Sequence, residues 1–316
     1  MQATCETPTM QAATYTRGLW YGVAAYAIWG LSPLYWKALN DVDSLQVLAN
    51  RVVWAVPVLA AVIVLRGRTS VMRRTMRDPR TMVVALLAAV FLAVNWGIFI
   101  WGVATDHVVE ISLGYFINPL ISVALGVIVL RERLRRGQIL AVSFAAAGVL
   151  YMTISVGSVP WISLVLAFSF AFYGLLKKRA EAAPALEGLT AEVSIVAVPA
   201  LAWMVVQALT GDSALGEEVA GTALLIGAGA FTAIPLLLFG ASAQRIPLSV
   251  VGLLQYIAPT LQFLLGVLAF GEAVSADELV GFALVWCGLA VFTADNVRNA
   301  RLGRIGVEVV PSEATG

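Results

Sequence analysis

Two basic side chains, Lys37 and Arg51, lie near the ends of strongly apolar segments, whereas the other Lys and Arg residues gather in polar connections. An ionisable group inside a membrane costs several kcal/mol and normally faces a protein interior or a wet cavity. We therefore predict that Arg51, together with Lys37, attracts an anionic or carbonyl-bearing part of a ligand. The alternative is that Arg51 pairs with Asp41, Asp43 or Glu110, while Lys37 reaches lipid headgroups.

A second set of polar side chains follows one face of an apolar segment that contains Pro119. Tyr115, Asn118 and Ser122 are spaced i, i+3 and i+7, so they share one side of a helix. Proline removes a backbone donor and leaves a carbonyl without its usual partner. The spacing predicts a polar stripe beside an interrupted helix. The alternative is that these side chains form structural hydrogen bonds between helices.

This arrangement recurs, because Leu113 to Ser155 has a diverged copy from Leu253 to Asp295. The register is fixed by five matched pairs: Pro119 with Pro259, Leu125 with Leu265, Gly126 with Gly266, Glu132 with Glu272, and Gly148 with Gly288. In transporters built from inverted repeats, interrupted helices at matching positions point to the substrate site. We predict helix breaks at Pro119 and Pro259.

The repeat also predicts a binding site near the middle of the membrane. Gln255 and Gln262 take the places of Tyr115 and Ser122 in the second copy. Tyr115, Asn118, Gln255 and Gln262 are therefore expected to line one site. Trp54 and Asn95 are further candidates, since they belong to a group of aromatic and amide residues that could hold a flat solute. Helix packing and interfacial belts are the commoner uses of Trp in membranes.

Other chemistry is sparse. The acidic residues Glu110 and Glu192 lie at the starts of apolar segments and are the candidates for proton coupling. His107 is the single histidine, in a connection. No Walker A loop, zinc pattern, dinucleotide turn or nucleophile elbow is present. We accordingly predict no catalytic residues, no metal site and no cofactor, and no enzymatic activity.

The elements that must position these residues are membrane helices. The chain is 60% hydrophobic and 12% charged, against about half and about a quarter in soluble domains. A spanning helix needs about 20 apolar residues. The sequence predicts an all-α membrane protein with ten spans: 18–38, 44–65, 82–104, 110–130, 138–156, 160–176, 190–209, 220–240, 249–270 and 279–295.

Charge sets the orientation, because Lys and Arg concentrate in cytoplasmic connections. Alternate connections hold all the basic residues except Lys37 and Arg51: Arg17, 66–80, 131–136, 177–179, Arg245 and 298–304. The opposite connections hold acidic residues, namely Asp41, Asp43, Asp106, Asp212, Glu217, Glu218, Glu272, Asp277 and Glu278, and no Lys or Arg. Both termini are thus predicted to be cytoplasmic, and five helices per copy make the two copies inverted repeats. The predicted divisions are a disordered tail (1–17), two repeats (18–156 and 157–295) and a second cytoplasmic tail (296–316).

Six strings carry a family resemblance: AYAIWGLSPLYWK (25–37), NRVVW (50–54), NWGIFIWG (95–102), SLGYFINPL (112–120), AFSFAFYG (167–174) and QYIAPTLQF (255–263). With them the chain resembles the RarD proteins of the EamA branch of the drug/metabolite transporter (DMT) superfamily. The resemblance implies a ten-helix permease of the bacterial cytoplasmic membrane, made of two five-helix repeats. Asn50 departs from the family pattern, which has His before the Arg.

The expected function is secondary active transport of a small organic metabolite or drug-like solute by alternating access, as an exporter driven by a proton or solute gradient. The expected partners are that solute and the lipid bilayer, without nucleic acid; a homodimer is compatible with the sequence. A membrane sensor or assembly factor that binds a ligand without moving it is the first alternative. An intramembrane enzyme is the second, although the chain has no paired catalytic groups.

Overall fold

The computed structural model describes residues 8–105, 107–156, 160–179, 183–216, 218–271 and 276–301, which are helical with short connections. The first half contains α1 (Pro8–Gly30), α2 (Ser32–Lys37), α3 (Ser44–Leu65), α4 (Thr69–Arg77), α5 (Pro79–Ala104), α6 (Val108–Val129) and α7 (Arg136–Val156). The second half contains α8 (Trp161–Arg179), α9 (Ala185–Thr210), α10 (Val219–Ala243), α11 (Leu248–Gln255), α12 (Ile257–Ala269) and α13 (Ala276–Arg301). This confirms the prediction of an all-α membrane protein.

Nine spans within the described residues, one of them formed by α11 and α12 together, are long and apolar enough to cross a membrane. The long helix α1 is not among the nine, but it packs along α10 and α12 as a spanning helix would. A count of ten spans therefore stays a prediction. Because α1 begins at Pro8, part of the segment expected to be a disordered tail is helical. Residues 1–7 and 302–316, most of the predicted tails, lie outside the described residues.

One of the two predicted proline breaks is correct and the other is wrong. The span that contains Pro259 is split at Tyr256 into α11 and α12, as expected where proline cannot donate to the preceding turn. Pro119, by contrast, lies inside the continuous helix α6. The first predicted span is also divided, at Leu31, where Pro33 occupies the first turn of α2. Breaks thus occur in the fourth span of one half and the first span of the other.

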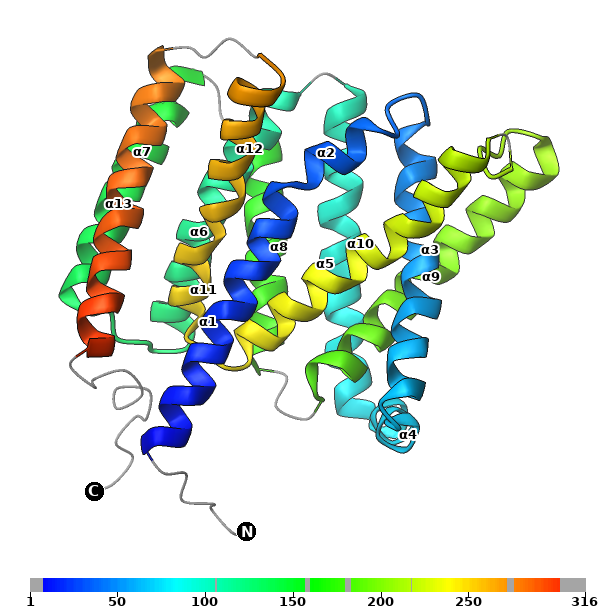
Figure 1. Ribbon diagram of the computed structural model, residues 1–316, viewed down its shortest axis with the longest axis horizontal. Coiled ribbons are helices and arrows are strands. Elements are labelled where there is room, and N and C mark those ends of the chain that lie inside the picture. Colours follow the sequence, from blue (N-terminus) through cyan, green and yellow to red (C-terminus); the bar gives the residue numbers. More distant parts are fainter. Residues whose placement is uncertain are drawn as a thin grey trace.

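The helix contacts follow a two-fold pattern. If the spans of each half are numbered in order, α1, α3, α5, α6 and α7 match α8, α9, α10, α11–α12 and α13. The contacts between α6 and α8 correspond to those between α12 and α1. Likewise, the contacts between α5 and α9 correspond to those between α10 and α3. The matched helices α3 and α9, α6 and α11, and α7 and α13 contact each other. Adjacent α7 and α13 run in opposite directions in Figure 1, as inverted copies would.

The basic and acidic connections lie at opposite ends of the bundle. In Figure 1 the start of α1, the end of α13 and the amphipathic helix α4 all lie at the lower end. We call this the basic end, because α4 and the neighbouring connections carry Arg residues; the opposite end, with Asp41, Asp43 and Asp212, is the acidic end. Asp106, Glu217 and Glu272, which the sequence also placed there, lie outside the described residues.

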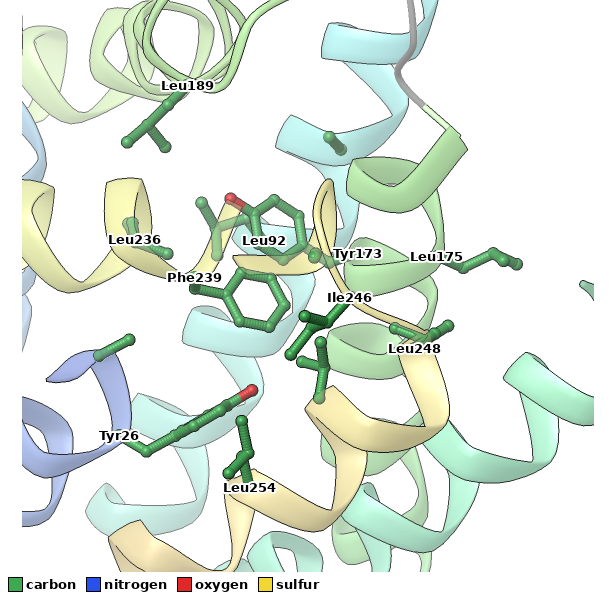
Figure 2. Close-up of a cluster of buried hydrophobic side chains, with 14 of the residues drawn as sticks. Tyr26, Leu92, Tyr173, Leu175, Leu189, Leu236, Phe239, Ile246, Leu248 and Leu254 are labelled. Atoms are coloured by element: carbon green, nitrogen blue, oxygen red, sulfur yellow. The ribbon is translucent and has the colours of Figure 1, made fainter. Parts of the chain in front are cut away.

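The bundle is closed at the basic end by a packed core. All eight residues of α11, which starts at this end, are buried, whereas only Pro259 and Gly266 are buried in α12. Figure 2 shows side chains from α1, α5, α8, α9, α10 and α11 that converge in this core. Tyr173 stacks on Phe239 with ring centroids 5.7 Å apart, and Tyr26 meets Phe239 edge-on at 6.2 Å. Such close packing excludes water from this end in the conformation described.

The N-terminus of α11 is capped by a side chain from the other half of the chain. Pro247 at the cap position offers no side-chain acceptor, and the first amides of a helix need one. The Glu132 carboxylate accepts hydrogen bonds from the amides of Leu248 (2.6 Å) and Ser249 (2.8 Å). The negative charge also complements the helix dipole. Glu132, which the sequence placed in a basic connection, thus holds the two halves together at the basic end.

Replacement of Glu132 by Ala is expected to lower the free energy of unfolding by about 2 kcal/mol, because two charge-assisted hydrogen bonds and a cap are lost together. Denaturant titration of the purified protein in detergent measures this change. Hydrogen exchange at the amides of Leu248 and Ser249 should accelerate as well. The neighbouring exposed Arg133, changed to Ala, is the control and should alter stability by less than about 0.5 kcal/mol. Unaltered exchange at both amides would contradict the cap.

Candidate functional site

The guanidinium of Arg51 is enclosed by aromatic rings from neighbouring helices. Its Cζ lies 4.8 Å from the ring centroid of Trp96 on α5 and 5.3 Å from that of Trp36 on α2. Tyr115 on α6 interacts with it electrostatically, and Phe99 lies beside Tyr115 with ring centroids 6.4 Å apart. We call Trp36, Arg51, Trp96, Phe99 and Tyr115 the Arg51 cluster. It lies in the acidic half of the bundle, about 10 Å in from the start of α3.

Arg51 has no anionic partner in the part of the chain that the structure describes. Its Nε is buried without a hydrogen-bond partner, and the ion pairs found involve other basic residues. Asp43, one of the acids considered for pairing, caps α3 by accepting from the amides of Leu45 and Gln46. A buried charge without a partner is costly. Cation–π contacts with two indoles offset part of this cost, and the charge stays available to a ligand.

Tyr115 keeps an accessible surface beside Arg51. Its side chain is 41% exposed, and Ser112, one turn earlier on α6, is exposed too. The Arg51 cluster is therefore not fully covered by other side chains, and a solute can reach it.

Three other predicted site residues do not join the Arg51 cluster. Lys37 is exposed, and its Nζ lies 3.9 Å from the ring centroid of Phe270. The Trp54 indole donates to Asn50 Oδ1 at 3.2 Å, along its own helix. The Asn95 amide donates to the Leu166 carbonyl and to Ser169 Oγ, both at 3.0 Å. Trp54 and Asn95 thus serve helix geometry and packing in this conformation.

The polar stripes of α6 and α11 do meet, but inside a closed contact. Gln255 Nε2 donates to Ser122 Oγ at 3.1 Å, and Ser122 Oγ lies 3.5 Å from Asn118 Oδ1. All three side chains are buried. A Cβ added to Gly252 would approach the Pro119 carbonyl oxygen to 2.8 Å, so the helices touch closely here. Helix bridging, the alternative to ligand binding, describes Gln255 and Ser122 in this conformation.

Two polar atoms beside this contact lack partners. Gln255 Oε1 and the Tyr26 hydroxyl are both buried without a hydrogen bond of good geometry, although the two side chains face each other. Gln262, one turn beyond the helix break, donates to the Trp29 carbonyl at 3.2 Å. The predicted group of four therefore divides: Tyr115 belongs to the Arg51 cluster, Gln255 and Gln262 hold helices together, and Asn118 contacts Ser122 of its own helix.

The two acidic candidates differ in their surroundings. Glu110 lies in the first turn of α6, and its Oε2 is buried without a partner. Glu192 on α9 accepts from Lys177 Nζ on α8 at 2.6 Å, and each side chain is only 3% exposed. The prediction that Lys177 belongs to a cytoplasmic connection is wrong, because α8 continues to Arg179 and turns Lys177 into the bundle. Pairing with Glu192 makes this burial tolerable.

A second ion pair that the sequence did not indicate lies near the first. Arg68, which precedes α4, donates through Nε to Glu187 at 2.5 Å, and Glu187 is fully buried in the first turn of α9. This hydrogen bond raises the pKa of the Arg68 guanidinium above its ordinary value. The pair joins the basic connection after α3 to α9, which adds a further link across the two halves at the basic end.

No group of three or more His, Cys, Asp or Glu side chains able to hold a metal ion occurs among the described residues. Cys287, in α13, is a free thiol. The Arg51 cluster likewise offers a cation and aromatic rings rather than a nucleophile with a base. Its chemistry is that of binding.

Known proteins are similar in sequence to this chain over nearly its whole length. The chain is 48% identical to protein RarD of Streptomyces exfoliatus, over 92% of each chain. It is 40% identical to protein RarD of Escherichia coli, over 92% of this chain and 99% of that protein. The model of the EamA-like transporter family matches residues 16–154. The chain belongs to the RarD family. Membership confirms the resemblance inferred from the sequence strings, and it makes the chain a multi-pass permease of the DMT superfamily in the bacterial inner membrane.

Two further comparisons accord with RarD membership. An uncharacterized transporter of Bacillus subtilis, YojE, is 39% identical over 93% of this chain and 99% of its own length. A solved structure titled "Crystal structure of protein" aligns with a TM-score of 0.68 at 19% identity, and covers 88% of this chain and 97% of that one. At this identity the structural likeness shows the fold alone. The RarD permease has a helix arrangement that has also been determined experimentally in another protein.

Proposed function

We propose that this RarD permease is a secondary active transporter that moves a small organic metabolite or drug-like solute across the cytoplasmic membrane by alternating access. Transport is outward, driven by a proton or solute gradient. Both termini are cytoplasmic, so the basic end of the bundle faces the cytoplasm and the Arg51 cluster lies on the outer side. The chain has ten spans, built as repeats at 18–156 and 157–295.

The observation that carries this proposal is the unpaired charge of Arg51 inside an aromatic enclosure. A permease must bind its solute away from water and then release it, so it needs a site that is accessible yet only partly satisfied. Arg51 has no ionic partner among the described residues, and Tyr115 beside it is 41% exposed. Ionisable residues in membrane segments mark solute pathways more often than structure.

Alternating access follows from the two-fold pattern of helix contacts. Inverted repeats can exchange conformations, so that the end closed in one state opens in the other. In the conformation described, the core around Tyr173 and Phe239 closes the basic end, and the Arg51 cluster lies beyond it. Loading of solute from the cytoplasm then requires this core to separate. The caps and ion pairs at the basic end, such as Glu132 on α11, are the contacts that must break.

For coupling, Glu110 and Glu192 are the two candidate proton sites. Glu110 has a carboxylate oxygen without a hydrogen-bond partner in the outer half. Glu192 already pairs with Lys177, so proton binding there requires the pair to open. A gradient of another solute would need neither residue. Transport measured with and without a pH gradient separates these modes.

Transport can be tested before the solute is identified. The full chain is reconstituted into liposomes loaded with an isotope-labelled bacterial metabolite extract, and the released solutes are measured by mass spectrometry. We expect at least one organic solute to leave faster than from protein-free liposomes. Its rate should fall at least about tenfold in Arg51→Ala, since a charged hydrogen bond is worth about 1.5 to 3 kcal/mol. Arg133→Ala, which removes an exposed charge at the basic end, should match the wild type.

If no solute leaves faster than from protein-free liposomes, with or without a pH gradient or external counter-solute, the transporter proposal is wrong. A sensor or assembly factor would then account for ligand binding without release. If transport occurs but is equal in Arg51→Ala, transport stands and the site lies elsewhere in the bundle.

A further inference from the structure

The Arg51 cluster contains a single positive charge. Lys37, the basic residue of α2, is exposed, and its ammonium lies over the ring of Phe270 rather than in the cluster. One carboxylate would neutralise this charge, and the fork of the guanidinium fits a carboxylate through two parallel hydrogen bonds. A doubly charged phosphate ester would leave one negative charge uncompensated in the site.

The cluster offers little to an ammonium group next to that carboxylate. No carboxylate forms an ion pair with Arg51 in the described part of the chain. The nearby amide oxygen, Asn50 Oδ1, already accepts from the Trp54 indole. The rings of Trp36 and Trp96, which could hold a cation, already face the guanidinium. A zwitterion such as an amino acid would therefore carry an unpaired cation into the site, at a large desolvation cost.

The surfaces around the charge are flat and apolar. Trp36 meets Phe231 of α10 edge-on with ring centroids 5.4 Å apart, and Phe231 stacks on Tyr35 at 4.5 Å. These contacts continue the aromatic lining from α2 to α10. Aromatic rings favour a planar or apolar body, which can stack or meet them edge-on.

From these three features we infer that the Arg51 cluster selects a singly charged organic acid. The carboxylate pairs with Arg51, and the flat apolar body lies against the rings of Trp36, Trp96 and Phe99. This inference rests on the proposed function, because it names the solute class of the same site. It excludes both amino acids and phosphorylated metabolites as preferred solutes.

Four probes with one phenyl body and different charges test this selectivity. They are 3-phenylpropanoate (one negative charge), 3-phenylpropanamide (neutral), phenylalanine (zwitterionic) and 2-phenylethyl phosphate (doubly charged). Binding to the full chain in detergent is measured by tryptophan fluorescence, which the indoles of the cluster should report. We expect 3-phenylpropanoate to bind about 30-fold more tightly than the amide, the value of a charge-assisted pair. Equal or tighter binding of any other probe overturns the inference, as does no binding of 3-phenylpropanoate.

Variants of Arg51 locate the probe. Arg51→Gln should lose the preference for the carboxylate over the amide, whereas Arg51→Lys should keep part of it because the charge remains without the fork. The folded state of Arg51→Gln is checked by its unfolding midpoint, which should be equal or higher because an unpaired buried charge has been removed. Arg133→Gln is the control that removes an exposed charge at the basic end. A preference retained in Arg51→Gln overturns the inference.

The binding experiment and the liposome experiment can give negative results independently of each other. Selective binding of 3-phenylpropanoate without release of any solute from liposomes would support the solute class and contradict transport. Release of a neutral or zwitterionic solute, with no binding of the carboxylate probe, would support transport and contradict the solute class.

Discussion

Replacement of Lys177 by Met is expected to lower the free energy of unfolding by about 3 to 5 kcal/mol, the cost of removing one partner from a buried ion pair. Lys177 and Glu192 are each 3% exposed and 2.6 Å apart. Met fills a similar volume, so packing is largely kept. What is lost is the cation, and the Glu192 carboxylate is left buried without it. Unfolding in detergent, followed by tryptophan fluorescence, measures the change.

The double variant Lys177→Met with Glu192→Leu separates charge from packing. With both charges absent, the loss should shrink to less than about 1.5 kcal/mol, because an apolar pair of similar volume often replaces a buried ion pair at little cost. Lys37→Met, at an exposed site, is the control and should stay within about 1 kcal/mol of the wild type. A double variant as unstable as Lys177→Met would show that shape, and not the charge pair, stabilises this contact.

The helical architecture could be predicted because the membrane imposes it locally. Every span must be apolar and must satisfy its own backbone hydrogen bonds, so length and composition locate it along the chain. The internal repeat was equally readable, since matched residues such as Pro119 and Pro259 keep their spacing. Whether each proline interrupts its helix could not be predicted from the sequence. α11 and α12 separate next to Pro259, but α6 continues through Pro119, and neighbouring helices decide which outcome occurs.

The candidate site was predicted in part, for a similar reason. Arg51 stood out because a cation in an apolar segment is costly, and the structure places it in an aromatic enclosure without a partner among the described residues. Spacing also predicted that Tyr115 and Asn118 share a face of α6. Spacing gives the face of a helix but not what covers it. Tyr115 is exposed, whereas Asn118 is buried next to the contact of Ser122 with Gln255 of α11.

The residues that sequence reasoning missed all depend on a partner in another helix or connection. Lys177 looked like a connection residue because Lys178 and Arg179 follow it, yet the turn of α8 directs it to Glu192. Glu132 looked like the end of a helix, although its acceptors serve α11 in the other half. The recurrence of the glutamate at Glu132 and Glu272 was the one available signal for the cap. No local pattern identifies Glu187, whose partner Arg68 precedes α4.

Substitution of Gly229 by Ala is expected to destabilise the protein by about 3 kcal/mol, the upper end of the usual range for overpacked sites. Gly229 on α10 lies directly against the backbone of α3. An added Cβ would lie 2.3 Å from the carbonyl carbon of Trp54 and 2.6 Å from the Ala55 nitrogen. Backbone cannot rotate away as a side chain can, so the two helices must separate. Small residues at such crossings are what allow membrane helices to touch.

The same substitution should also weaken ligand binding, because α3 carries Arg51 less than one turn from Trp54. A shift of α3 away from α10 changes the position of the guanidinium relative to Trp96, and the affinity for 3-phenylpropanoate should fall with it. Gly221→Ala, in the same helix with nothing within 4 Å of the added Cβ, is the matched control. It should be neutral or stabilising by up to about 1 kcal/mol, as Ala is the better helix former. Equal unfolding midpoints for the two Ala variants would show that the contact of α10 with α3 is not tight enough to position Arg51.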